Sequence, residues 1–161
     1  MIEEFFKEKK TLYLFFYLTI NIKICMIKSI NHIGIAVTDL DEAIETFRKI
    51  FQFKDVHREE VADQKIKVAS FKVGEMLIEL TYPTSPDGPI GKFIEKNGGK
   101  GGLHHIAFES DNVSEEIKRI EAEGITLIDK EPRLGAHEMM IAFMHPKSTA
   151  GVLTEVCQPK H

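Results

Sequence analysis

Two stretches of the chain alternate between apolar and other residues in the same way. They are residues 30–37, with the sequence INHIGIAV, and residues 103–108, with the sequence LHHIAF. Alternation with a period of two is typical of a β-strand. After each stretch the apolar positions change to the spacing of a helix, in residues 40–51 and residues 113–120. The pattern therefore predicts a strand followed by a helix at two places in the chain.

Acidic residues and an amide stand at the start of both predicted helices. Asp39 and Asp41 lie at the first start, and Asp111 and Asn112 lie at the second. The side-chain oxygen of such a residue accepts a hydrogen bond from a backbone N–H that the first helical turn leaves unpaired. Gly124 follows the second helical pattern, where a glycine commonly ends a helix. These residues support both helix predictions.

Further strand-like runs follow each helix. In the first half they cover residues 54–60, 66–73 and 76–82, and in the second half they cover residues 126–130, 139–144 and 151–157. Gly74 and Glu75 predict a hairpin turn between the two longer strands of the first half. The order β-α-β-β-β therefore occurs twice, which is the signature of an internal repeat.

The repeat predicts an α+β fold built from two tandem βαβββ modules that form one curved sheet. We expect the first module at about residues 28–83 and the second at about residues 103–158, within a single domain of residues 26–161. The linker at residues 84–102 is rich in Gly and Pro and contains a short helical pattern.

The facing of the strand residues selects two histidines. Residues two apart on a strand share a face, so His32 shares its face with Gly34, whose small size leaves room for a ligand or an ion. In the second stretch His105 shares its face with Ala107, while His104 lies on the opposite face. The repeat therefore makes His105 the counterpart of His32, and it makes His104 a wall residue.

Two glutamates repeat in the same manner on the last strand of each module. Glu79 and Glu155 each lie among apolar neighbours, where an ionised carboxylate is costly unless it is paired or bound to a cation. The two histidines are 73 residues apart and the two glutamates are 76 apart, so the modules contribute equivalent pairs. Imidazole and carboxylate together suit Co, Ni, Zn, Fe or Mn. The sequence therefore predicts a central divalent metal site at His32, Glu79, His105 and Glu155, with positions open to substrate.

Composition narrows the class of protein. The 161 residues carry a net charge of −4 without a dense cluster of Lys and Arg, which argues against a nucleic-acid partner. Two distant cysteines do not form a disulfide framework, so we expect a reducing compartment and a cytoplasmic protein, with Cys157 as a small core residue. Residues 1–25 form an extension whose apolar run is too short to span a bilayer, so no membrane partner is expected.

Four motifs resemble those of a known family. They are residues 31–37, 102–108, 132–137 and 145–155. The paired modules and the His/Glu ligands resemble the vicinal oxygen chelate superfamily, and the last two motifs resemble the methylmalonyl-CoA epimerase family within it. The resemblance implies metal ligation by His32, Glu79, His105 and Glu155. It also implies a Co²⁺ ion, with Ni²⁺, Mn²⁺ or Zn²⁺ as alternatives, methylmalonyl-CoA as substrate, C2 epimerisation through proton abstraction, and a homodimer.

One position departs from the family pattern. Some epimerases place a further glutamate on the strand that corresponds to residues 66–71, and Val68 stands there in this chain. Because valine carries no proton, we expect Glu155 and Glu79 to be catalytic as well as ligating. The family-like loops also make His137, Lys147 and Ser148 candidates for substrate binding, and Arg133 a candidate for contacting phosphate.

Other functions of the same fold stay open at this point. A glyoxalase I-type lyase uses the same set of four ligands, with a glutathione hemithioacetal as substrate. Ring-cleaving dioxygenases usually need three ligands, so Glu79 argues mildly against them. A non-catalytic small-molecule binding protein of this fold lacks the ligand set, so the four residues favour an enzyme.

Overall fold

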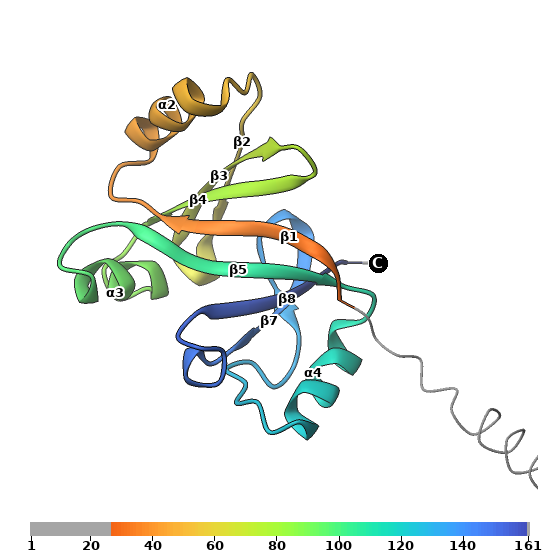
Figure 1. Cartoon of the computed structure of the whole chain (residues 1–161). Coiled ribbons are helices and arrows are strands. Elements are labelled where there is room, and N and C mark those ends of the chain that lie inside the picture. The colour runs from red at the N-terminus through yellow and green to blue at the C-terminus, as the bar shows by residue number, and fades with distance from the viewer. Residues whose placement is uncertain (1–26, 161) are drawn as a thin grey trace, which may run out of the picture.

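The computed structural model describes residues 27–160, whose eight named strands form one curved sheet (Figure 1). The strands are β1 (Ile27–Ala36), β2 (His57–Val61), β3 (Ile66–Val73), β4 (Met76–Pro83), β5 (Gly102–Ser110), β6 (Arg133–Leu134), β7 (Met139–Met144) and β8 (Leu153–Pro159). The helices are α2 (Leu40–Phe51), α3 (Pro89–Lys96) and α4 (Val113–Ala122), with 3₁₀ turns η1 (Ala62–Gln64), η2 (Ala136–Glu138) and η3 (Pro146–Ser148). The extension predicted for residues 1–25 lies outside the described residues.

The strand order is the same in both halves of the sheet. From edge to edge it is β2-β3-β4-β1-β5-β8-β7-β6. The first strands of the two halves, β1 and β5, pair antiparallel at the centre. Each also pairs parallel with the last strand of its own half, β1 with β4 and β5 with β8. The predicted α+β fold of two tandem βαβββ modules is therefore confirmed.

The outer edge of the second half differs from the prediction. Residues 126–130 form no strand; Leu127 makes a single β-bridge with Met144. The N–H of Ile128 donates to the Phe143 carbonyl at 2.8 Å, and the Asp129 carboxylate accepts from the Phe143 N–H at 2.9 Å. Since these contacts use both backbone groups of Phe143, the ladder does not extend here. The edge strand is instead the short β6.

A helix covers the outer face of each half (Figure 1). Ile44 of α2 packs with Phe71 and Leu80 of the first half, and Ile117 of α4 packs with Val156 of the second half. The predicted caps are present: Asp39 Oδ1 accepts from the Glu42 N–H at 2.9 Å, and Asn112 Oδ1 accepts from the Glu115 N–H at 3.2 Å. Gly124 follows α4 with φ of +79°, as expected for a residue that ends a helix.

The faces of β1 follow the predicted alternation. Ile33 and Ile35 pack against the cluster under α2. Gly34 lies on the opposite, concave face, where the His105 ring occupies the space of a side chain: a Cβ on Gly34 would come within 2.0 Å of His105 Cε1. The small residue of β1 therefore makes room for a histidine of β5. Within residues 27–160, no helix is both long and apolar enough to cross a membrane.

Candidate metal centre

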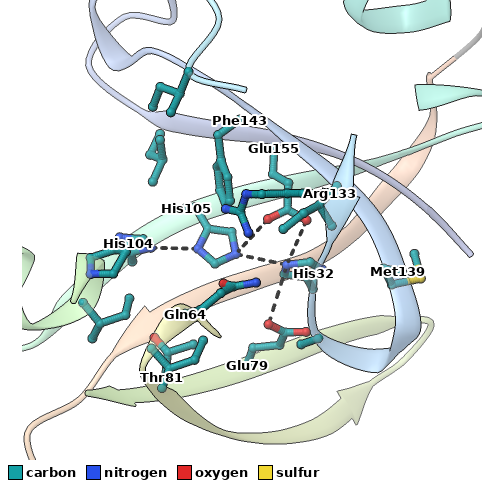
Figure 2. Close-up of a pocket in the computed structure, with 17 residues that line it drawn as sticks. His32, Gln64, Glu79, Thr81, His104, His105, Arg133, Met139, Phe143 and Glu155 are labelled. Atoms are coloured by element: carbon teal, nitrogen blue, oxygen red, sulfur yellow. Dashed lines mark hydrogen bonds and ion pairs between the residues drawn. The ribbon is translucent and has the colours of Figure 1, made fainter. Parts of the chain in front are cut away.

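Four ligand-type side chains meet on the concave face of the sheet (Figure 2). They are His32 of β1, Glu79 of β4, His105 of β5 and Glu155 of β8. The Nε2 atoms of the two histidines are 3.0 Å apart. His32 Nε2 also lies 3.7 Å from Glu79 Oε2 and 3.8 Å from Glu155 Oε1, and His105 Nε2 lies 3.6 Å from Glu155 Oε2. None of the four residues is more than 5 % exposed. The structure thus brings together all four predicted ligands.

The register of the four central strands explains this convergence. Gly34 stands opposite Glu79 on β4 and opposite His105 on β5. On the other side of β5, Ala107 stands opposite Glu155. Because residues in register point to the same face of a sheet, the repeat places one imidazole and one carboxylate from each module around a common point.

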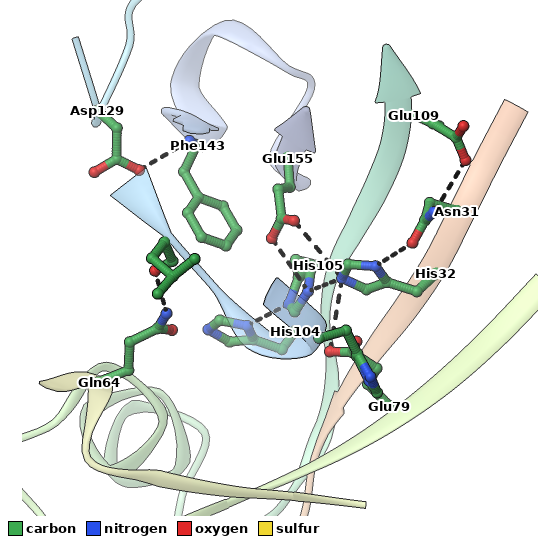
Figure 3. A network of polar contacts seen from close by, with 12 residues as sticks. Asn31, His32, Gln64, Glu79, His104, His105, Glu109, Asp129, Phe143 and Glu155 are labelled. Atoms are coloured by element: carbon green, nitrogen blue, oxygen red, sulfur yellow. Dashed lines mark hydrogen bonds and ion pairs between the residues drawn. The ribbon is translucent and has the colours of Figure 1, made fainter. Parts of the chain in front are cut away.

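Hydrogen bonds orient the His32 ring (Figure 3). His32 Nδ1 lies 3.0 Å from Asn31 Oδ1, and Asn31 Nδ2 donates to Glu109 Oε2 at 3.2 Å. Since the Asn31 amide nitrogen is used by Glu109, its oxygen accepts from the Nδ1–H of His32. This leaves the Nε2 lone pair of a neutral His32 directed at the centre. Sequence reasoning missed Asn31, although it directly precedes His32, because alternation identifies faces and not hydrogen bonds.

Burial favours neutral imidazoles at the centre. It lowers the pKa of His32, and together with the charges of His32 and His104 it lowers the pKa of His105 well below the ordinary value. His104 Nδ1 lies 2.9 Å from His105 Nδ1, and burial lowers the pKa of His104 to about 4. His104 is not one of the four ligand-type residues, as predicted, but it lines the same cavity as His105, next to Phe93, so its expected place on the opposite face is wrong. The pairing of β1 with β5 shifts register beside His104, where strict alternation fails.

The two carboxyl groups have opposite pKa shifts. Burial, followed by the charge of Glu79, raises the pKa of Glu155 well above its ordinary value. Burial also acts to raise the pKa of Glu79, but the contact with His137 and the charge of His32 outweigh it, so this pKa is lowered. The protein groups alone therefore compensate the charge of Glu79 better than that of Glu155.

The donor set fits a divalent transition-metal ion. Two nitrogen ligands at about 2.1 Å from one ion lie about 3.0–3.4 Å apart when they are neighbours in its coordination shell. The observed separation of 3.0 Å between His32 Nε2 and His105 Nε2 agrees with that spacing. Glu155 Oε1 is buried without a hydrogen-bond partner among the described residues, as expected of an oxygen that awaits a cation. Imidazole with carboxylate favours Co, Ni, Zn, Fe or Mn over the hard cations Mg and Ca.

Cys157 also lies near His32 and Glu155. Burial raises the pKa of its thiol, and the side chain packs with Ala107 and Ile141. A protonated thiol is a poor metal ligand, so the structure agrees with the prediction of a core residue.

A cavity of about 180 Å³ adjoins the four ligands. Its polar wall includes Gln64, Thr81 and Arg133, and its apolar wall is formed by the side chains of Ile66, Ile90, Ile128, Met139, Ile141, Phe143 and Leu153. Arg133 approaches the Phe143 ring at 5.4 Å and pairs with Asp129 at 3.2 Å. The cavity combines an apolar enclosure with one positive side chain beside the carboxylates, which suits the acidic end of a small organic ligand.

The remaining predicted residues lie outside this cavity. His137 does not line this cavity. Its Nε2 instead lies 3.4 Å from Glu79 Oε1. Lys147 and Ser148 belong to η3, where the Ser148 hydroxyl accepts from the Thr126 N–H. Val68 is buried on β3, packed with Ile66 of the cavity wall. Their roles in substrate binding stay predictions.

Replacing Gly34 by alanine should disturb the centre from within the sheet. The new Cβ would collide with the His105 ring, so we expect the free energy of unfolding to fall by about 1–3 kcal/mol, measured by urea denaturation. Gly102→Ala is the matched control, because its Cβ would meet only Asn97 Nδ2 at 3.5 Å. Equal denaturation midpoints for Gly34→Ala and wild type would contradict the packing described here.

Comparisons with known proteins agree with this fold and site. Residues 31–143 match the model of the Glyoxalase/Bleomycin resistance protein/Dioxygenase superfamily. An uncharacterised protein of Bacillus subtilis (strain 168) is 40% identical over 131 residues, which cover 81% of this chain and 92% of that protein. The mitochondrial methylmalonyl-CoA epimerase of Dictyostelium discoideum is 37% identical over 132 residues, which cover 81% of this chain and 78% of that enzyme.

A solved structure extends the similarity to three dimensions. It is a methylmalonyl-CoA epimerase in complex with methylmalonyl-CoA and NH₄⁺, 36% identical to this chain, with a TM-score of 0.78. The match covers 83% of this chain and 96% of the solved one. The chain therefore belongs to the Glyoxalase/Bleomycin resistance protein/Dioxygenase superfamily and, within it, to the methylmalonyl-CoA epimerase family of isomerases.

Proposed function

We propose that this chain is a divalent-metal-dependent epimerase that interconverts (2S)- and (2R)-methylmalonyl-CoA. The observation that carries the proposal is the convergence of Glu79 and Glu155, from opposite sides of the central strand pair, with two neutral imidazoles beside one cavity. The relatives named methylmalonyl-CoA epimerase, one of them solved with that substrate, support the choice of reaction.

The reaction requires one proton to leave C2 and one to return on the other face. C2 lies next to a thioester carbonyl. Removal of the C2 proton therefore leaves an enolate, whose oxygen carries the negative charge. A divalent ion held by His32, His105, Glu79 and Glu155 would supply Lewis-acid stabilisation of that charge. One group must then accept the proton and a second must donate a proton to the opposite face of C2.

Glu79 and Glu155 are the residues that we assign to this proton transfer. They lie on β4 and β8, on either side of the β1–β5 pair, so they approach a substrate in the cavity from different directions. With Val68 in place of an acidic residue on β3, these two carboxyl groups are the acidic side chains that line the cavity. Each of the two carboxyl groups is both a candidate ligand and a candidate base, so each would hold the ion and would also exchange a proton with C2.

The rest of the cavity wall binds and shields the substrate. The apolar side chains enclose the C2 methyl group and exclude water, which limits loss of the abstracted proton to solvent. Arg133 places a positive charge on the wall, where it can pair with the free carboxylate of the substrate.

The proposal is tested by assaying conversion of (2S)- to (2R)-methylmalonyl-CoA with protein supplied with Co²⁺. We expect kcat/KM of at least about 10⁴ M⁻¹s⁻¹. The hemithioacetal of glutathione is assayed in parallel. Turnover of the hemithioacetal without epimerisation would replace this proposal by a glyoxalase I-type activity, and ligand binding without either reaction would indicate a binding protein.

The finer expectations stay predictions. Co²⁺ is the ion we expect, with Ni²⁺, Mn²⁺ and Zn²⁺ as alternatives, and metal analysis of the purified protein distinguishes them. The homodimer and the cytoplasmic location follow from the family resemblance and the cysteine content, and they await direct measurement.

A further inference from the structure

An imidazole from the second half of the chain lies between two carboxylates of the first half. His137 Nε2 is 3.4 Å from Glu79 Oε1, and His137 Nδ1 is 3.6 Å from Glu59 Oε1. The same Glu59 oxygen accepts the backbone N–H of His137 at 2.9 Å. Glu59 therefore contacts both the backbone and the ring of His137, and the opposite edge of the ring faces Glu79.

The backbone at this point adopts an unfavourable conformation. His137 has φ of 54° and ψ of 29°, and the next residue, Glu138, has φ of 53°. Two consecutive non-glycine residues in the left-handed region cost free energy, and such conformations persist where the surrounding contacts require them. The contact with Glu59 is one such requirement. The strained backbone therefore indicates that contacts such as the one with Glu59 hold the His137 ring in a defined position.

The two oxygens of Glu79 face different partners. Oε1 faces His137, while Oε2 lies 3.7 Å from His32 Nε2 at the centre. The approach of His137 Nε2 to Oε1 is an ion-pair contact and not a hydrogen bond. The ring nevertheless restricts the rotation of the carboxylate, so Oε2 stays on the side of His32 Nε2.

We propose that Glu59 and His137 form a positioning pair that holds Glu79 in the orientation required for ion binding. The effect on catalysis rests on the proposed function, whereas the effect on ion affinity does not. Partners of a metal ligand that lie outside the coordination shell are commonly worth a factor of about 10–100 in metal affinity. The pair also connects the modules, since Glu59 lies on β2 and His137 belongs to the loop before β7.

The decisive variant is His137→Gly, because glycine accepts the left-handed backbone and removes the ring. We expect the dissociation constant for Co²⁺, measured by titration calorimetry on the full chain, to rise about 10–100-fold. The urea midpoint should not fall, since glycine relieves the strain. Glu138→Gly is the matched control: it relieves the same strain one residue later, so Co²⁺ affinity should stay within about twofold of wild type.

A double-mutant cycle separates positioning from a general structural role. Glu79→Ala removes the carboxylate that His137 is proposed to hold, so adding His137→Gly to it should weaken Co²⁺ binding less than about twofold further. Asparagine in His137→Asn supplies an amide N–H in place of the imidazole N–H and tolerates the left-handed backbone. This variant should therefore bind Co²⁺ more tightly than His137→Gly. Unchanged Co²⁺ affinity in His137→Gly, or an equal loss with and without Glu79, would overturn the proposal.

Two further outcomes distinguish this proposal from the proposed function. Wild-type protein that binds Co²⁺ but does not epimerise methylmalonyl-CoA would overturn only the proposed function. Normal epimerisation by His137→Gly with unchanged Co²⁺ affinity would overturn only the positioning pair.

Glu59→Gln tests the other member of the pair. It weakens the contact of Glu59 with the His137 ring, so we expect the dissociation constant for Co²⁺ to rise, by less than in His137→Gly.

Discussion

Replacing Glu155 by glutamine is expected to lower kcat for epimerisation of methylmalonyl-CoA by about 10²–10⁴-fold. An amide neither accepts nor returns a proton at C2, and it offers the ion a neutral oxygen in place of an anionic one. Glu155 is only 2 % exposed, and its Oε1 has no hydrogen-bond partner among the described residues. Steady-state assays with each epimer measure the loss.

The fate of the C2 hydrogen in deuterated water gives a sharper test of the same prediction. If Glu79 and Glu155 serve opposite faces of C2, Glu155→Gln should still exchange the hydrogen of one epimer through Glu79, with little inversion. Glu79→Gln should retain exchange of the other epimer. Proton NMR follows both reactions. Glu75→Gln is the control, because Glu75 is exposed in the turn between β3 and β4. Full exchange and epimerisation in both active-site variants would refute the assignment.

The centre of the fold was predictable because its constraints are local. Alternation along β1 and β5 determines which side chains share a face, and the repeat selects the equivalent residue in the other half. His32 and His105 follow from that argument alone. Glu79 and Glu155 follow because an ionised carboxylate among apolar neighbours needs a cation, whatever the details of the sheet. The alternation and the internal repeat are therefore enough to predict the facing of the ligand residues on the four central strands.

The periphery was less predictable because its structure depends on contacts between distant residues. The edge strand predicted at residues 126–130 is lost because Ile128 and Asp129 use the backbone groups of Phe143. Asn31 orients His32 only because Glu109, 78 residues away, fixes its amide. Neither contact has a signal in the hydrophobic pattern.

The contacts of His137 were also not predictable from the sequence. Its place in a family-like loop made it a candidate for binding substrate, whereas the structure places its ring behind Glu79 and outside the cavity wall. Its left-handed backbone has only a weak sequence signal, since histidine is enriched in that region but adopts it far less readily than glycine. A loop motif can therefore identify a residue near the site without identifying which of the groups there it contacts.

Removal of the divalent ion is expected to abolish most activity and to destabilise the protein. Without a cation, the charge developing on the substrate oxygen loses electrostatic stabilisation that is typically worth about 10²–10³-fold in rate. Glu155, whose charge the protein groups compensate less well than that of Glu79, also loses the charge compensation that a bound cation would supply. An ion present at 100 times its dissociation constant stabilises the folded state by about 2.7 kcal/mol, so the thermal midpoint should fall on chelation.

The control for chelation is the identity of the ion that restores function. After dialysis against dipicolinate, Co²⁺ should restore both the rate and the thermal midpoint, whereas Mg²⁺ at the same concentration should restore neither, because imidazole ligands favour transition ions. The His32→Ala variant should show no thermal shift with Co²⁺, since it lacks the ligand that lies next to all three of the other ligand residues. Full activity in protein shown by elemental analysis to be free of metal would refute the metal-dependent mechanism, while leaving the fold and the two carboxylates as the basis for another account of proton transfer.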